Sequence, residues 1–126
     1  MKKIEAIIKE EKLEAVKNAL EEKGFISLTV TPVSGRGMQK GLSLQWRVGE
    51  YRVDLLPKLK VEIVVRDEDY PTVVDIVCEA ARTGEIGDGM IFVLPVEDLC
   101  RVRTGERGEA ALALKNNGIK QPVGQT

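Results

Sequence analysis

The chain of 126 residues contains no histidine, only two cysteines, and few aromatic residues, which make up 4% of it. Histidine is the commonest general base and the commonest side-chain metal ligand, so its absence excludes histidine-dependent catalytic triads. Cys78 and Cys100 lie inside apolar patterns without CxxC spacing, which predicts two buried free thiols rather than a disulfide or a metal site. Because no pair of acidic residues stands out as an active site, we expect a protein that is not an enzyme.

Long apolar runs and an imbalance of charge are missing as well. No stretch approaches the roughly 20 apolar residues needed to cross a bilayer, and the chain does not open with a charged and then apolar leader. The 19 basic and 20 acidic residues almost cancel, so the overall charge does not favour nucleic acid or a membrane surface as a partner. We therefore expect a cytosolic protein in which any anion site is local.

The sequence does contain strand and helix patterns in regular order, enough for one compact domain. Four segments alternate or run apolar as strands do: residues 2–9, 25–33, 58–65 and 90–94. Two segments repeat apolar side chains at helical spacing: residues 11–23 and 69–84. The order βαββαβ predicts an α+β fold, a ferredoxin-like sandwich with two helices on one face of an antiparallel sheet.

About twenty residues separate the second and third predicted strands, where a hairpin needs two to five. This long loop, about residues 36–56, is rich in glycine and carries cationic and amphipathic side chains: Arg36, Lys40, Trp46, Arg47 and Tyr51. Such a segment suits a surface that docks onto another molecule, although a mobile hairpin tip explains it as well. We place the domain at residues 1–108, with residues 99–103 as a further short edge strand, and expect residues 109–126 to be a flexible tail.

Two groups of residues suggest an anion site. Gly87, Asp88 and Gly89 follow the second predicted helix, and glycines there free the backbone to turn and expose its N–H groups, although an ordinary turn explains this triplet better on its own. Arg101 and Arg103, two residues apart on an extended segment, would project from one side, where their guanidinium groups suit phosphate. Pairing with surface glutamates is the alternative for these arginines.

Four stretches resemble the nitrogen regulatory PII signal-transduction family, in the family's order. They cover residues 1–108 and read MKKIEAIIK at 1–9, GRGMQKG at 35–41, EYRVDLLPKLKVEIVV at 50–65 and TGEIGDGMIFVLPVEDLCRVRTGERG at 83–108. The resemblance implies a homotrimer with adenine-nucleotide sites, for ATP or ADP, in the clefts between subunits. The nucleotide-binding positions that it implies are Thr29, Gly35, Gly37, Met38, Glu62, Val64, Gly87, Asp88, Gly89, Met90, Arg101 and Arg103.

The same resemblance implies a second effector and a regulatory role. In the family, 2-oxoglutarate binds beside the ATP phosphates through a magnesium ion held by a glutamine, here Gln39, and through a lysine, here Lys58; Gly37, Gly41 and Gly87 complete that site. Effector binding selects shapes of the long loop, which docks onto partners such as an ammonium transporter or glutamine synthetase. Trp46 and Arg47 are then the partner-contact residues, and a transporter would recruit the protein to the membrane.

The chain departs from the family pattern at three places. Met38 and Met90 stand where relatives commonly carry basic residues, so we expect a shift in preference from ATP toward ADP or AMP. Tyr51 occupies the place of a tyrosine that is uridylylated in many relatives, but the sequence at residues 46–50 differs from the usual context, which argues against modification. The alternatives are a specialised PII-like regulator of nitrogenase or of a carbon or other transporter, and a small enzyme on the same fold.

Overall fold

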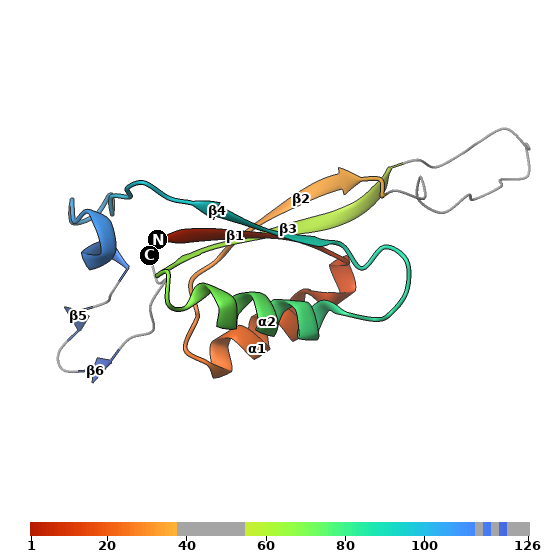
Figure 1. The fold of residues 1–126 in the computed structure, drawn as a ribbon, viewed down its shortest axis with the longest axis horizontal. Coiled ribbons are helices and arrows are strands. Elements are labelled where there is room, and N and C mark those ends of the chain that lie inside the picture. The colour runs from red at the N-terminus through yellow and green to blue at the C-terminus, as the bar shows by residue number, and fades with distance from the viewer. Residues whose placement is uncertain (38–54, 113–114, 117–118, 121–126) are drawn as a thin grey trace, which may run out of the picture.

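The computed structural model describes residues 1–37, 55–112, 115–116 and 119–120, drawn in colour in Figure 1. Its elements, in chain order, are β1 (Lys2–Ile8), the 3-10 turn η1 (Glu10–Lys12), α1 (Leu13–Glu22), β2 (Thr29–Gly35), β3 (Leu56–Val65), α2 (Tyr70–Ala81), β4 (Met90–Pro95), the 3-10 turn η2 (Gly108–Ala111), and the short strands β5 (Lys115–Asn116) and β6 (Ile119–Lys120). No helix in this part of the chain is long and apolar enough to cross a membrane.

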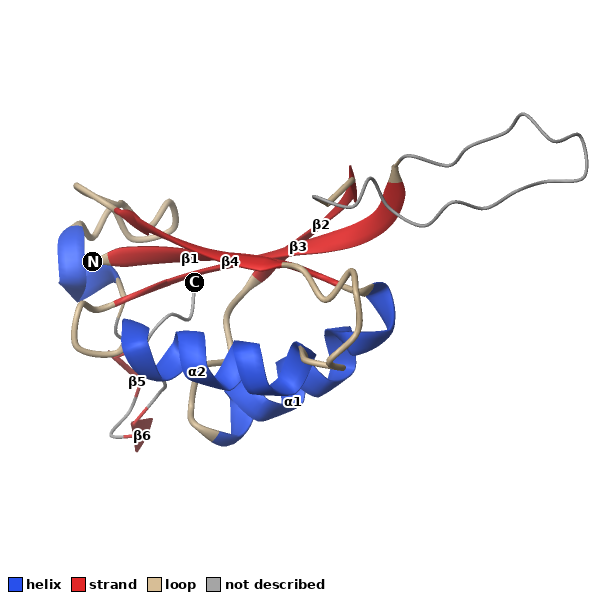
Figure 2. Ribbon diagram, turned by 45° about the vertical axis from the view of Figure 1, so that its right-hand side comes forward, coloured by secondary structure: helices blue, strands red, loops and turns tan. Residues whose placement is uncertain are grey.

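The four long strands form one antiparallel sheet in the order β2-β3-β1-β4. Both helices lie on the same face of this sheet, as Figures 1 and 2 show. The predicted α+β, ferredoxin-like order βαββαβ is therefore confirmed. β1 is central and pairs with both β3 and β4. The first strand of the domain therefore lies beside the last of its four long strands.

The core lies between the sheet and the helices because alternate strand residues point to one face. β1 and β3 each bury every second residue, and both helices add one apolar stripe. The buried set is Ile4, Ala6, Ile8, Val16, Leu20, Phe25, Val61, Ile63, Val65, Val73, Val77 and Ala81. A contiguous layer of this kind supplies most of the stability of a small domain.

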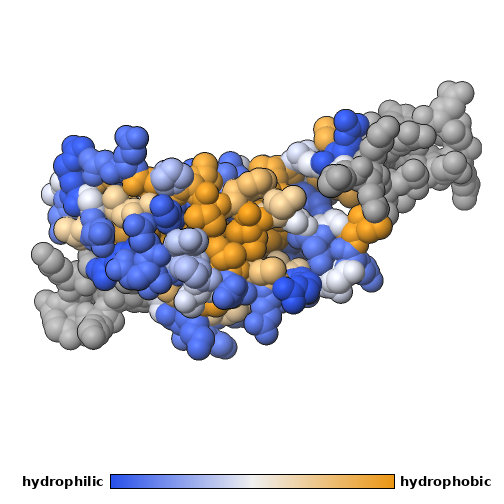
Figure 3. Space-filling model, viewed as in Figure 1, coloured by the Kyte–Doolittle hydropathy of each residue, from blue (hydrophilic) through white to orange (hydrophobic). Residues whose placement is uncertain are grey.

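The opposite face of the sheet is open. It carries charged residues of β1 and β3, while the edge strand β4 exposes apolar side chains there and along its border: Met90, Phe92, Val93 and Leu94. Figure 3 shows an apolar patch near the middle of the molecule, where β4 passes above α2 in the view of Figure 1. At the other edge β2 contains Pro32, which pairs with Leu59 of β3. Exposed apolar area at a sheet edge is typical of a surface that another chain covers.

Three predictions from the sequence are wrong. The second strand begins at Thr29 rather than at residue 25, because the chain first has to cross from the helix layer to the sheet, and it buries Phe25 in doing so. Residues 99–103 form no strand in the described part of the chain: they lead into a turn at residues 102–104, with a single bridge between Cys100 and Arg107. Both cysteines are free as predicted, but Cys100 is exposed and Cys78 is half-buried.

Candidate functional site

The predicted site residues within the described ranges fall into two groups at opposite ends of the sheet. Gly87, Asp88 and Gly89 follow α2 and lie near Lys58, at the start of β3. Thr29, Glu62 and Val64 lie toward the other end of β3, beside residues 99–103. Lys58 and Glu62 are four residues apart on one strand, which corresponds to about 13 Å. One chain therefore presents two partial sites.

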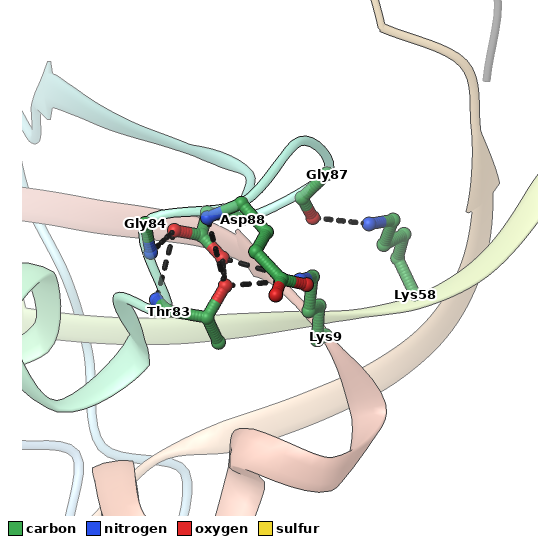
Figure 4. Close-up of polar contacts among 7 residues, drawn as sticks. Lys9, Lys58, Thr83, Gly84, Gly87 and Asp88 are labelled. Carbon is green, nitrogen blue, oxygen red and sulfur yellow. Dashed lines mark hydrogen bonds and ion pairs between the residues drawn. The ribbon is translucent and has the colours of Figure 1, made fainter. Parts of the chain in front are cut away.

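The segment from Thr83 to Gly89, named the glycine turn here, is closed by the carboxylate of Asp88. Oδ2 accepts hydrogen bonds from the backbone N–H groups of Thr83 and Gly84 at 2.8 and 2.9 Å, and Oδ1 accepts one from the Thr83 hydroxyl at 2.5 Å. Lys9, directly after β1, places its ammonium 3.3 Å from Oδ1 and donates a hydrogen bond to Thr83 Oγ1 at 3.1 Å. Figure 4 shows these side chains converging inside the turn.

This arrangement lowers the pKa of Asp88 far below its ordinary value. The largest cause is the hydrogen bond from the Thr83 side chain, followed by the backbone N–H of Thr83, with Gly84 and Lys9 adding to the effect against the cost of partial burial. Hydrogen bonds to the ionised form favour that form. Asp88 is therefore ionised at neutral pH, and both of its carboxylate oxygens accept hydrogen bonds from groups of the same chain.

The turn contains three glycines, Gly84, Gly87 and Gly89, which all have positive φ, and Gly89 is also required by lack of space. Gly89 has a φ of +110°, and a Cβ there would collide with the backbone carbonyl of Ile7 in β1. Gly87 has a φ of +93°, and a Cβ there would come 3.2 Å from the Lys58 ammonium. Lys58 donates a hydrogen bond to the Gly87 carbonyl oxygen, as drawn in Figure 4. β1 and β3 thus each fix one side of the turn.

The backbone N–H groups of the turn remain available for a ligand. Those of Gly87, Asp88 and Gly89 donate no hydrogen bond to any residue that the structure describes. Successive N–H groups in a glycine-rich turn form a concavity that binds anions. At the same end of the sheet, Gly35 is the last residue of β2 and pairs with Leu56 of β3, and Gly37 follows two residues later. A Cβ at either glycine would meet open space. Met90 begins β4 next to the turn and is 60% exposed.

The second group lines a cavity of about 620 Å³ at the other end of the sheet. Thr29 pairs with Glu62 across β2 and β3, and Val64 lies two residues further along β3. Lys3 of β1 forms ion pairs of 2.7 Å with Glu62 and 3.0 Å with Glu5. The hydrogen bond with Lys3 lowers the pKa of Glu62, and bonds with Glu62 and then Glu5 raise the pKa of Lys3. The cavity offers apolar walls with a few polar groups, as small-molecule sites do.

Arg101 and Arg103 stand on the rim of this cavity in different environments. The Arg101 side chain is only 8% exposed; its guanidinium donates to the Ala111 carbonyl and lies 3.6 Å from Glu106. Arg103 is exposed and forms no ion pair with a described residue. The prediction that both lie on one side of an extended segment is wrong, because backbone hydrogen bonds from Arg101 to Glu106 and from Gly105 to Arg101 close a turn.

Sequence reasoning missed Lys3, Lys9, Thr83 and Leu112 as parts of these two sites. Lys3 and Lys9 look like ordinary solvated lysines along β1, and only the pairing of β1 with β3 and β4 brings them to Glu62 and to the glycine turn. Leu112 is 4% exposed and lines the cavity, although it falls in the segment 109–126 that we expected to be a flexible tail. Several predicted positions lie outside the described residues: Met38, Gln39, Gly41, Trp46, Arg47 and Tyr51.

Comparison with known proteins identifies the family of this chain. The family described as "Nitrogen regulatory protein P-II" matches residues 1–106. The chain is 55% identical over 112 residues to nitrogen regulatory protein P-II 2 of Methanothermobacter thermautotrophicus, covering 89% of this chain and 97% of that protein. It is 54% identical to nitrogen regulatory protein P-II of Microchaete diplosiphon, covering 89% of this chain and 100% of that protein. The chain therefore belongs to the nitrogen regulatory protein P-II family, whose members are signalling regulators.

Proposed function

We propose that this protein reports nitrogen and energy status by binding an adenine nucleotide, ATP or ADP, together with 2-oxoglutarate, and by presenting its long loop to partner proteins accordingly. The observation that carries the proposal is the division of one site into two partial sites at opposite ends of the sheet. The glycine turn offers backbone N–H groups for phosphate, and the cavity beside Thr29, Glu62 and Val64 offers apolar walls for a base. Two copies of the chain would join them.

In a homotrimer, neighbouring copies would join the two partial sites, and they would also cover the apolar surface of β4. Placing the cavity end of one copy against the glycine turn of the next would bring Arg103 toward phosphates held at the turn. Guanidinium groups suit bidentate phosphate binding. Closed rings of identical subunits use the same two surfaces at every interface, so three copies would form three equal sites. The exposed Met90, Phe92 and Leu94 would be buried in the same assembly.

The dicarboxylate would bind at the glycine-turn end through Lys58, whose ammonium already lies on the Gly87 carbonyl. Gly37, Gly41 and Gly87 would line that site, and Gln39 would hold a magnesium ion with the nucleotide phosphates. The ion would supply charge neutralisation between the two anions. Because β2 and β3 lead directly into the long loop, a ligand at this end would favour some loop conformations by its differential affinity. An ammonium transporter at the membrane and glutamine synthetase are the proposed partners, and Trp46 and Arg47 the proposed contacts.

A second candidate is a specialised PII-like regulator of nitrogenase or of a carbon or other transporter, with a preference for ADP or AMP. Met90 favours it, because an exposed methionine stands beside the anion-binding turn where a basic residue would add a charge-assisted hydrogen bond. Met38 would have the same effect. The partner-binding role is unchanged in this candidate, while the nucleotide that releases the partner differs.

The two candidates are separated by calorimetric titration of the purified protein with ATP, ADP and AMP, with and without magnesium and 2-oxoglutarate. Light scattering on the same material measures the assembly. The first candidate expects a trimer in which 2-oxoglutarate strengthens ATP binding, and the second expects ADP or AMP to bind more tightly than ATP. Arg103→Ala should weaken ATP binding by about tenfold, whereas the charge-matched control Lys17→Ala on the exposed face of α1 should not. A monomer without affinity for any adenosine phosphate would disprove both candidates.

A third measurement concerns catalysis. A sensor has to bind its nucleotide without appreciable hydrolysis, so incubation with ATP and magnesium should release no phosphate above the rate without protein. Turnover that disappears in Arg103→Ala would instead support the small-enzyme alternative.

A further inference from the structure

Two lysines connect the glycine turn to the sheet, Lys58 and Lys9, and the proposed function assigns a role only to Lys58. Lys9 follows the last residue of β1, so its backbone is fixed by the sheet, and its side chain is only 16% exposed. Its ammonium contacts both the Asp88 carboxylate and the Thr83 hydroxyl, at 3.3 and 3.1 Å. A lysine with two such partners in a partly buried place is ordered rather than solvated.

The carboxylate of Asp88 closes the turn by reaching back across it. Its two oxygens accept from the Thr83 N–H, the Thr83 hydroxyl and the Gly84 N–H, so residues 83 and 88 are joined into a ring. Lys9 is the group in Figure 4 that ties this ring to β1. The position of the ring decides where the N–H groups of Gly87, Asp88 and Gly89 point.

The charge of Lys9 matters as much as its position. Asp88 is ionised, and a carboxylate beside a phosphate site repels the phosphate. The ammonium of Lys9 compensates that charge from 3.3 Å, while the carboxylate oxygens also accept hydrogen bonds from internal donors.

We propose that Lys9 and Asp88 are positioning residues of the anion site: the Lys9–Asp88–Thr83 contacts hold the glycine turn in the shape that binds phosphate, and neither side chain touches the ligand. The inference rests on the proposed function, since it assigns roles within the same site. It also assigns Asp88 a role through its side chain that differs from direct contact with the nucleotide phosphates, the role that family resemblance implies for this position.

A double-mutant cycle tests this assignment in the full-length protein. Lys9→Met keeps the length of the side chain and removes its charge, and Asp88→Asn keeps an acceptor oxygen and removes the charge of its partner. Each should weaken ATP binding in calorimetry by about tenfold, and the double variant should be no weaker than the worse single variant, because the residues act as one unit. Lys9→Arg should recover most of the affinity, and the matched surface variant Lys17→Met, which removes the Glu14 ion pair of α1, should change nothing.

Direct contact of Lys9 with phosphate gives a different result. In that case Asp88→Asn would free the ammonium and leave ATP binding unchanged or stronger. Alternatively, the losses of ATP affinity in the two single variants would add up in the double variant. Either outcome would overturn the inference.

Amide hydrogen exchange without any ligand provides an independent readout, also for variants that fold less well. The Thr83 and Gly84 amides, which donate to Asp88, should exchange at least about tenfold faster in Lys9→Met while the amides of β1 and β3 keep their protection. Unchanged exchange at these two amides would overturn the inference. If wild-type protein binds no ATP, the proposed function fails, whereas the exchange experiment still decides whether Lys9 positions the turn.

Discussion

The two ends of the sheet present their binding groups in opposite ways. At the glycine turn the side chains are tied to each other and the backbone N–H groups are left for a ligand. At the cavity end the backbone of residues 99–108 is bonded within itself, and exposed Arg103 is left instead. The first end depends on backbone shape and tolerates little change, while the second depends on side-chain type. This difference makes each end sensitive to a different kind of mutation.

Replacing a glycine at each end should expose the contrast most strongly. Gly89→Ala should destabilise the protein by more than about 4 kcal/mol, because the new methyl group would strike the Ile7 carbonyl at a φ of +110°. Gly105→Ala in the turn after Arg101 should cost only about 1 kcal/mol, since a Cβ there meets open space at a φ of +76°. Chemical denaturation followed by circular dichroism measures both. Equal losses would show that backbone angle alone decides.

The next largest effect is expected in the wall of the cavity. Leu112 is 4% exposed and Val102, in the same cavity lining, is 98% exposed. Leu112→Ala should cost about 2 kcal/mol of unfolding free energy, because a buried side chain is lost, while Val102→Ala should cost less than about 0.5 kcal/mol. Thermal unfolding of the two variants beside wild type compares them. A neutral Leu112→Ala would mean that the chain after η2 adds nothing to the folded domain.

A smaller effect is expected where β3 meets the glycine turn. Lys58→Met removes the hydrogen bond to the Gly87 carbonyl and should cost about 1 kcal/mol, with faster amide exchange confined to the turn. Lys60→Met, two residues along the same strand, serves as the control because it leaves that bond intact. The comparison would fail if the two variants lost the same stability.

The smallest effects are expected in the pH dependence of stability, where one aspartate at each end has a lowered pKa. Thr83 is the main cause for Asp88, and the hydrogen bond from Arg107 is the main cause for Asp98. Since a lowered pKa means that the unfolded chain takes up the proton first, each contribution is complete above the unfolded pKa of about 3.9 and is lost as the pH falls through the folded pKa. Carboxyl titration by NMR, with denaturation from pH 6 to pH 2, follows both.

The comparison of Asn variants then separates the two aspartates. Asp88→Asn should flatten the acid limb of the stability curve more than Asp98→Asn, because Asp88 accepts several internal hydrogen bonds, whereas the Asp98 side chain is 44% exposed and its ion pair is screened by water. A steeper loss for Asp98→Asn would reverse this ranking.

The architecture was predictable from the sequence because it depends on periodicity. Alternation in β1 and β3 and helical spacing in α1 and α2 fix which residues are buried, and the observed core follows that pattern. The start of β2 was misplaced, because alternation of Ile26 with its neighbours looks the same in a strand and in the extended chain before it. The prediction that both cysteines are buried was wrong for a related reason. Cys100 was assigned to an apolar strand pattern, but its segment leads into a turn and the side chain is exposed.

The candidate site was predictable only where local chemistry is sufficient. The glycines of the turn could be named from residue type, because positive φ and close approach leave few other choices. The division of the site between two ends of the sheet could not, since it depends on the register of β3 against β1. For the same reason the roles of Lys9 and Lys3 could not be predicted. Asp88 is 79 residues from Lys9 along the chain, and Glu62 is 59 residues from Lys3.

Pro32 on the edge strand β2 limits how such sheets can grow. A proline has no N–H to offer an incoming strand, so the β2 edge is a poor template for further pairing, whereas β4 carries no proline before its final residue, Pro95. Copies of this chain can therefore extend a sheet in one direction only. That polarity disfavours endless fibrils and favours small assemblies of fixed size.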